Sequence, residues 1–194
     1  PAVDKQQLLG VVVSAPVTAQ LALALTDSDN GLTESLARQA AWRSAKARDF
    51  PTVGDFIMRE SAAAGIPVVG VQLFDASGLN PANRIPASGL SAALALGYSG
   101  KDPSFTEALI GMPVAGLTGT LADRFLTPGT HVVAGRAQAK TGTLTGVNTL
   151  AGWVVDDDGS LITFVVMVDG AGTLEARSAL DQFVAALGPC GCRQ

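Results

Sequence analysis

Residues 149–168 read TLAGWVVDDDGSLITFVVMV, and this stretch decides the fold. Thr149–Val155 and Leu161–Val168 are apolar runs of strand length, and the residues between them contain the Asp158-Gly159 pair typical of hairpin turns. Both runs are apolar almost throughout instead of alternating with polar residues, so both faces of the sheet should be buried. We therefore predict an antiparallel hairpin between helical layers, a mixed α/β (α+β) fold.

Helical patterns flank this hairpin. Gly172-Thr173 opens a helix whose apolar stripe is expected to consist of Leu180, Phe183, Val184 and Leu187. The pattern before the hairpin predicts one short strand over 68–74 and helices over 18–25, 32–48 and 87–96. Residues 112–135 are rich in Gly, Pro and Thr without periodicity, which predicts a long ordered connection of the kind that often lines a functional site.

Composition excludes several classes of protein. The 194 residues are 47% apolar and 15% charged, which fits one folded domain, or a large part of one, and argues against disorder. The formal net charge of −4 disfavours binding to nucleic acid or to an anionic membrane surface. The longest apolar run, Leu161–Val168, is far shorter than the roughly 20 residues that span a bilayer, so no transmembrane segment is predicted.

The two cysteines, Cys190 and Cys192, lie near the C-terminus. A structural zinc site needs about four ligands, and His131 is the single histidine, so no metal site is predicted. A local disulfide, bonds to something outside the chain, and two free thiols all remain open.

Two short motifs carry potential chemistry. Ser28-Asp29-Asn30 lies in a turn between predicted helices, and Lys140-Thr141-Gly142, followed by Thr143, lies just before the hairpin. Alone, each motif is weak, because a Ser-Asp-Asn triplet is usually a turn and a Lys-Thr-Gly triplet is usually the polar end of a strand. A phosphate-binding loop is excluded, since Ala134 and Ala139 stand where that motif requires glycine.

Together, in this order, the motifs resemble two parts of the signature Ser-x-x-Lys, Ser-Asp-Asn, Lys-Thr-Gly of serine acyl-transfer enzymes that process β-lactams and D-Ala-D-Ala peptides. Lys140 and Thr141 suit the carboxylate end of a peptide, and Gly142 lets a substrate backbone lie against the strand. The backbone N–H of Thr143 suits one half of an oxyanion hole. Ser28 suits proton relay to a leaving amine, and the Asn30 amide suits orientation of the substrate.

The wider sequence resembles one family in particular. Four segments follow one another in its order, beginning at Ser14-Ala-Pro-Val, Phe74-Asp-Ala-Ser-Gly-Leu-Asn-Pro-Ala-Asn-Arg84, Met112-Pro-Val-Ala-Gly-Leu and Ala137-Gln-Ala-Lys-Thr-Gly-Thr-Leu. This order resembles the D-alanyl-D-alanine carboxypeptidase/endopeptidase family, the class C low-molecular-mass penicillin-binding proteins. The resemblance covers Val11 to about Leu187, and residues 112–152 are its most specific part.

The resemblance implies a serine β-lactamase or penicillin-binding-protein transpeptidase-like fold. It implies hydrolysis of D-Ala-D-Ala bonds in peptidoglycan stem peptides through an acyl-enzyme, inhibition by β-lactams, no metal or organic cofactor, and export to the periplasm or cell wall. It maps catalytic roles onto Ser28, Asn30 and Lys140, and substrate-binding roles onto Thr141, Gly142 and Thr143.

One departure from the family is serious, because no serine in the chain is followed three places on by lysine. We therefore expect residues 1–194 to be the C-terminal portion of a single catalytic domain, inactive alone and completed by an N-terminal fragment. The alternative is a non-catalytic module that binds peptidoglycan or a protein. A milder departure is Ala76, where the family often has glycine.

Two further features favour structural interpretations. His131 follows a Pro-Gly-Thr turn, and no Gly-x-Ser-x-Gly elbow exists to complete a Ser-His-Asp triad, so a surface turn is expected there. Asp156, Asp157 and Asp158 are expected to form a solvated hairpin turn and not a cation site.

Overall fold

The computed structural model describes residues 10–46 and 49–191 and has an α+β fold. Its antiparallel sheet has the order β1-β2-β3, formed by β1 (Ala137–Leu144), β2 (Val147–Val155) and β3 (Leu161–Asp169). The predicted hairpin is confirmed, with Thr149 opposite Met167 and Val155 opposite Leu161. The chain reverses between β2 and β3 at Gly159, whose φ of 77° favours glycine.

The acidic hairpin turn is less solvated than the sequence predicts. Asp156 is only 2% exposed, and its Oδ1 accepts hydrogen bonds from the backbone N–H groups of Asp158 and Ser160. The first aspartate of the turn therefore closes the hairpin, and the expectation of a wholly solvated turn is wrong for this residue.

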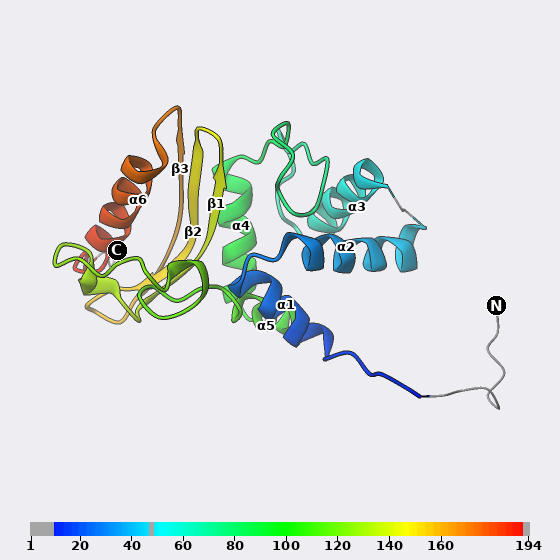
Figure 1. Ribbon diagram of the computed structural model, residues 1–194, viewed down its shortest axis with the longest axis horizontal. Coiled ribbons are helices and arrows are strands. Elements are labelled where there is room, and N and C mark those ends of the chain that lie inside the picture. The colour runs from blue at the N-terminus through cyan, green and yellow to red at the C-terminus, as the bar shows by residue number, and fades with distance from the viewer. Residues whose placement is uncertain (1–9, 47–48, 192–194) are drawn as a thin grey trace.

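Helices cover both faces of the sheet, as Figure 1 shows for α6 (Thr173–Leu187) and α4 (Ala87–Tyr98). Side chains alternate between the two layers along β2, so Leu150 and Val154 pack toward α6 while Ala151 and Trp153 pack toward α4. This double coverage explains why both hairpin strands are almost entirely apolar. The predicted stripe of α6 is wrong at Phe183, which is 46% exposed, whereas Leu180 and Val184 are buried.

The N-terminal helices partly match the prediction. The predicted helices over 18–25, 32–48 and 87–96 correspond to α1 (Val17–Thr26), α2 (Asn30–Ala45) and α4. The helices α3 (Phe50–Ala63) and α5 (Pro103–Leu109) were not predicted from the sequence. Each begins with an aspartate cap and a proline in the first turn, Asp49 with Pro51 and Asp102 with Pro103, and this signal was available in the sequence.

The strand predicted over 68–74 is wrong. Only one isolated bridge forms there, between Gln72 and Arg84. Gly70 has a φ of 79°, and the N–H of Val71 bonds to the carbonyl of Val68, so the backbone turns where a strand would continue.

Residues 112–135 form the ordered connection that their composition predicts. They contain two short 3₁₀ helices, η2 (Gly119–Leu121) and η3 (His131–Val133), and they bury Leu121, Phe125 and Val133 in the core beneath α6. Val114 bridges Gln138, the N–H of Ala115 bonds to the carbonyl of Ala137, and the N–H of Ala139 bonds to the carbonyl of Pro113. The connection therefore covers the outer edge of the first half of β1.

Strand β3 forms the other edge of the sheet and pairs, within the described residues, with β2 alone. Leu161 and Met167 on this strand are 47% and 41% exposed. Among the described helices, none has the length and apolar character needed to cross a bilayer. Cys190 is disulfide-bonded, and Cys192 lies outside the described residues.

Candidate active site

The Ser28-Asp29-Asn30 triplet forms the turn between α1 and α2, and its three residues have separate positions. Asp29 caps α2, because its Oδ1 accepts the N–H of Leu32 at 2.9 Å. Asn30 is the first residue of α2. Ser28 has a φ of 56°, a left-handed conformation that is costly for a residue with a side chain and that clusters at functional sites.

Close contacts with Gly111 and with the 112–135 connection that follows it place this turn beside the sheet. Thr26 Oγ1 donates a hydrogen bond to the carbonyl of Gly111 at 2.6 Å. A Cβ on Gly111 would meet the backbone of Ala22, and a Cβ on Gly119 would lie 2.2 Å from the Thr26 carbonyl. Gly111, just before the connection, and Gly119 within it therefore allow this part of the chain to pack directly on α1, and the connection in turn pairs with β1.

Lys140 on β1 contacts Ser28 directly. The Lys140 Nζ donates to Ser28 Oγ at 2.7 Å, across 112 positions of sequence, and to the carbonyl of Thr141 at 2.9 Å. In the described part of the chain no carboxylate lies within ion-pair distance of this amine. Burial lowers the pKa of Lys140, because a desolvated ammonium is less stable than a solvated one. Ser28 and Lys140, to which the resemblance gives catalytic roles, therefore lie together in one site.

The second half of β1 presents an open edge beside this pair. The backbone groups of Ala137 and Ala139 point outward to the 113–115 segment, and antiparallel alternation directs those of Thr141 and Thr143 outward as well. The N–H of Thr143 therefore faces the open edge. Gly142 has an additional role that the sequence analysis missed, since a Cβ there would lie 2.4 Å from Oγ1 of Thr149 on β2.

A cavity of about 720 Å³ lies along this edge. All six predicted site residues line it: Ser28, Asn30, Lys140, Thr141, Gly142 and Thr143. Other residues that line the cavity were not predicted from the sequence, among them Thr120, Arg124, Arg177 and the loop segment 75–79. Thr120 Oγ1 accepts a hydrogen bond from Thr141 Oγ1 at 2.9 Å, and no pattern in the sequence indicates this contact.

The charged groups around the cavity favour an anionic ligand. Arg124 forms a bidentate ion pair with Asp181 of α6, so its charge is compensated. The carboxylate of Asp75 accepts the N–H groups of Gly78 and Asn80. Lys140 and Arg177 have no ion-pair partner in the region that the structure describes. Two uncompensated cations thus line a cavity whose acidic side chain is engaged by its own loop.

His131 lies apart from this site, at the exposed start of η3 and outside the residues that line the cavity. Within the described residues, no group of three or more His, Cys, Asp or Glu side chains is arranged to hold a metal ion.

Comparisons with known proteins agree with this geometry. The model of the "D-Ala-D-Ala carboxypeptidase 3 (S13) family" matches residues 1–188. Carboxypeptidase DacB of Mycolicibacterium smegmatis is 35% identical over 182 residues, covering 93% of this chain and 39% of the relative. The chain therefore spans about two fifths of the length of this curated relative.

Solved structures share the fold. Penicillin binding protein 4 (dacB) from Haemophilus influenzae, in complex with a β-lactam, superposes with a TM-score of 0.76 and 28% identity over 89% of this chain and 40% of that one. A β-lactamase from Sphaerobacter thermophilus superposes with a TM-score of 0.62 and 20% identity over 96% of this chain and 67% of that one, which shows a likeness of fold. The fold is thus of the penicillin-binding-protein and β-lactamase type, and the chain belongs to the S13 family of D-Ala-D-Ala carboxypeptidases.

Proposed function

We propose that this chain forms the substrate-binding half of a serine-type D-alanyl-D-alanine carboxypeptidase/endopeptidase that acts on peptidoglycan stem peptides. The observation that carries the proposal is the hydrogen bond between Lys140 Nζ and Ser28 Oγ beside the open edge of β1. A strand edge with an adjacent proton-relay pair suits a peptide that binds as an added strand and is cleaved there.

Each group has a defined task in this mechanism. The peptide lies along 140–144, its terminal carboxylate contacts Thr141 and the nearby cations, and the N–H of Thr143 binds the oxygen of the scissile carbonyl. The Asn30 amide orients the substrate. A serine hydroxyl attacks the carbonyl carbon, its oxygen forms the ester bond, and the C–N bond breaks. The proton passes through Ser28 and Lys140 to the departing amine, and water later hydrolyses the ester.

The attacking serine and its base belong, in this proposal, to a Ser-x-x-Lys segment outside the 194 residues. Three observations support this. No serine of the chain has lysine three places on, and the curated relative is longer than the chain. The edge of β3, which has no partner strand among residues 10–46 and 49–191, offers a position for an added strand. The substrate class also leads us to propose that the complete enzyme works outside the cytoplasmic membrane.

Labelling with a fluorescent penicillin tests the proposal. The complete enzyme, which unites this chain with its Ser-x-x-Lys segment, should form one stable adduct and hydrolyse a D-Ala-D-Ala peptide. The isolated 194-residue chain should do neither. A stoichiometric adduct on the isolated chain would place the nucleophile within it. A complete protein that binds peptidoglycan peptides without hydrolysis or labelling would support the non-catalytic alternative.

A further inference from the structure

We propose that Glu34 is a positioning residue that holds one wall of the substrate cavity in place, a role that rests on the proposed function. The wall is the segment Asp75–Leu79, whose five residues all line the cavity. Glu34 is absent from the lining residues, so it acts on the cavity through this segment.

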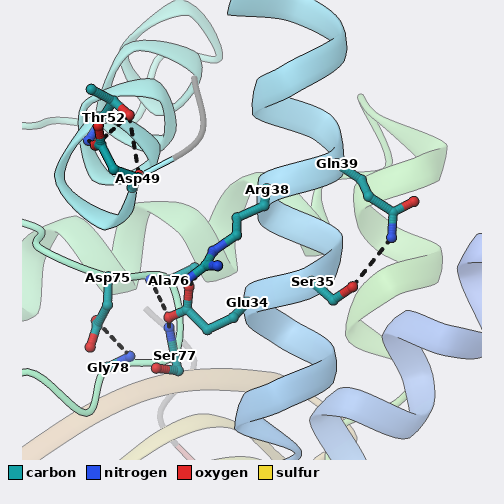
Figure 2. Close-up of polar contacts among 10 residues, drawn as sticks. All are labelled: Glu34, Ser35, Arg38, Gln39, Asp49, Thr52, Asp75, Ala76, Ser77 and Gly78. Atoms are coloured by element: carbon teal, nitrogen blue, oxygen red, sulfur yellow. Dashed lines mark hydrogen bonds and ion pairs between the residues drawn. The ribbon is translucent and has the colours of Figure 1, made fainter. Parts of the chain in front are cut away.

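Two hydrogen bonds connect Glu34 to the wall. Its Oε1 accepts the backbone N–H groups of Ala76 and Ser77, each at 2.9 Å, as Figure 2 shows. The Glu34 side chain is 14% exposed, so water competes weakly for this carboxylate. Hydrogen bonds to an ionised acceptor are stronger than those between neutral groups.

Among the residues that the structure describes, the remaining polar contacts of the wall are internal to its own loop. Asp75 accepts the N–H groups of Gly78 and Asn80 and the amide of Asn83, and Asn83 accepts the N–H of Phe74. These bonds fix the shape of the loop, but none of them joins it to the Ser28-Asp29-Asn30 turn or to α2. Glu34 supplies that connection from α2.

The position of Glu34 on α2 makes the connection specific. Asn30 and Glu34 are four residues apart, so they lie on the same face of the helix, one turn from each other. The helix that presents Asn30 to the cavity therefore also fixes the wall. A helix supports such a site precisely, because its hydrogen-bonded backbone keeps the spacing of the two residues fixed.

Three substitutions in the complete enzyme test the role. Glu34→Ala removes the acceptor, and kcat/KM for a D-Ala-D-Ala peptide should fall about tenfold, mainly through a higher KM, because the Ser28–Lys140 pair is untouched. Glu34→Gln keeps a carbonyl oxygen at the same position and should stay within about threefold of the original. Glu34→Asp is shorter by one methylene and should behave like alanine, which provides a second variant if Glu34→Ala does not fold.

Asp49→Ala is the matched control. Asp49 also accepts a backbone N–H, that of Thr52 (Figure 2). It caps α3, however, and is not among the residues that line the cavity. It should lower thermal stability and leave KM unchanged. Equal KM values for Glu34→Ala, Asp49→Ala and the unsubstituted enzyme would overturn the positioning role, as would failure of Glu34→Gln to restore KM. If the unsubstituted complete enzyme does not hydrolyse the peptide, the proposed function itself is wrong, and the positioning role that rests on it is wrong as well.

Discussion

The two halves of β1 have the same backbone geometry but different neighbours along their outer edge. Ala137–Ala139 are paired with residues 113–115, so their outward hydrogen-bonding groups are satisfied inside the protein. Lys140–Leu144 line the cavity instead. One strand is thus paired at its start and faces a cavity at its end, where we propose that substrate binds, because the neighbouring connection covers only half of it. The six predicted site residues lie in the open half or beside it.

Proline substitution should give the largest difference between the two halves of β1, with loss of activity in the open half and loss of stability in the covered half. Thr143→Pro removes an N–H that faces the open edge, so the complete enzyme should stay folded while kcat falls about 10²- to 10³-fold, the effect of losing one oxyanion donor. Ala139→Pro removes the N–H that bonds to Pro113 and should cost about 1–3 kcal/mol of stability. Peptide hydrolysis and thermal melting of both variants provide the check. If Thr143→Pro kept full activity, the assignment of the Thr143 N–H to the oxyanion hole would be wrong.

Side-chain removal on the same face of β1 should give the next largest contrast. Lys140→Ala removes the cation and the partner of Ser28, and kcat/KM of the complete enzyme should fall by roughly 10²-fold. The matched variant is Gln138→Ala, which loses hydrogen bonds to the carbonyls of Ile110 and Met112 in the covered half. It should affect stability and leave kcat/KM within about threefold. Equal losses of activity would contradict the division between the halves.

The lysine at the start of the open half should also titrate unusually. Burial disfavours the charged amine, so the pKa of Lys140 in the folded protein should lie below its ordinary value of 10.5. Below the folded pKa, Lys140 is protonated in both the folded and the unfolded state, so burial of its charge destabilises the folded state by the full amount. As the pH rises through the folded pKa, the folded state loses this proton first. The destabilisation then decreases until the pH passes the unfolded pKa. NMR titration of the Lys140 side chain, against the unfolded chain, measures the shift. A folded pKa at or above the unfolded value would contradict it.

The smallest effect is expected for the 112–135 connection that leads into the covered half. His131→Ala changes an exposed residue at the start of η3, away from the cavity. Activity of the complete enzyme should change by less than about threefold. A loss as large as that of Lys140→Ala would revive a triad that contains this histidine.

Local patterns predicted the regular elements well where a strong signal existed. The apolar runs and the Asp-Gly turn predicted the β2–β3 hairpin, and the Gly172-Thr173 start predicted α6. The helices α3 and α5 were missed, although an aspartate cap and a proline mark the start of both. The strand expected over 68–74 failed, because apolar residues satisfy a strand pattern whether or not a partner strand lies beside them.

The sequence by itself determined the hairpin and the helical layers, because periodicity is a property of neighbouring positions, and the family resemblance carried by its motifs identified six cavity residues. Only the tertiary structure decided the distance between Ser28 and Lys140, the open half of β1, the contact of Thr120 with Thr141, and the hold of Glu34 on the cavity wall. These contacts join residues far apart in sequence. They depend on how α1, α2 and the 112–135 connection pack, which no local pattern encodes.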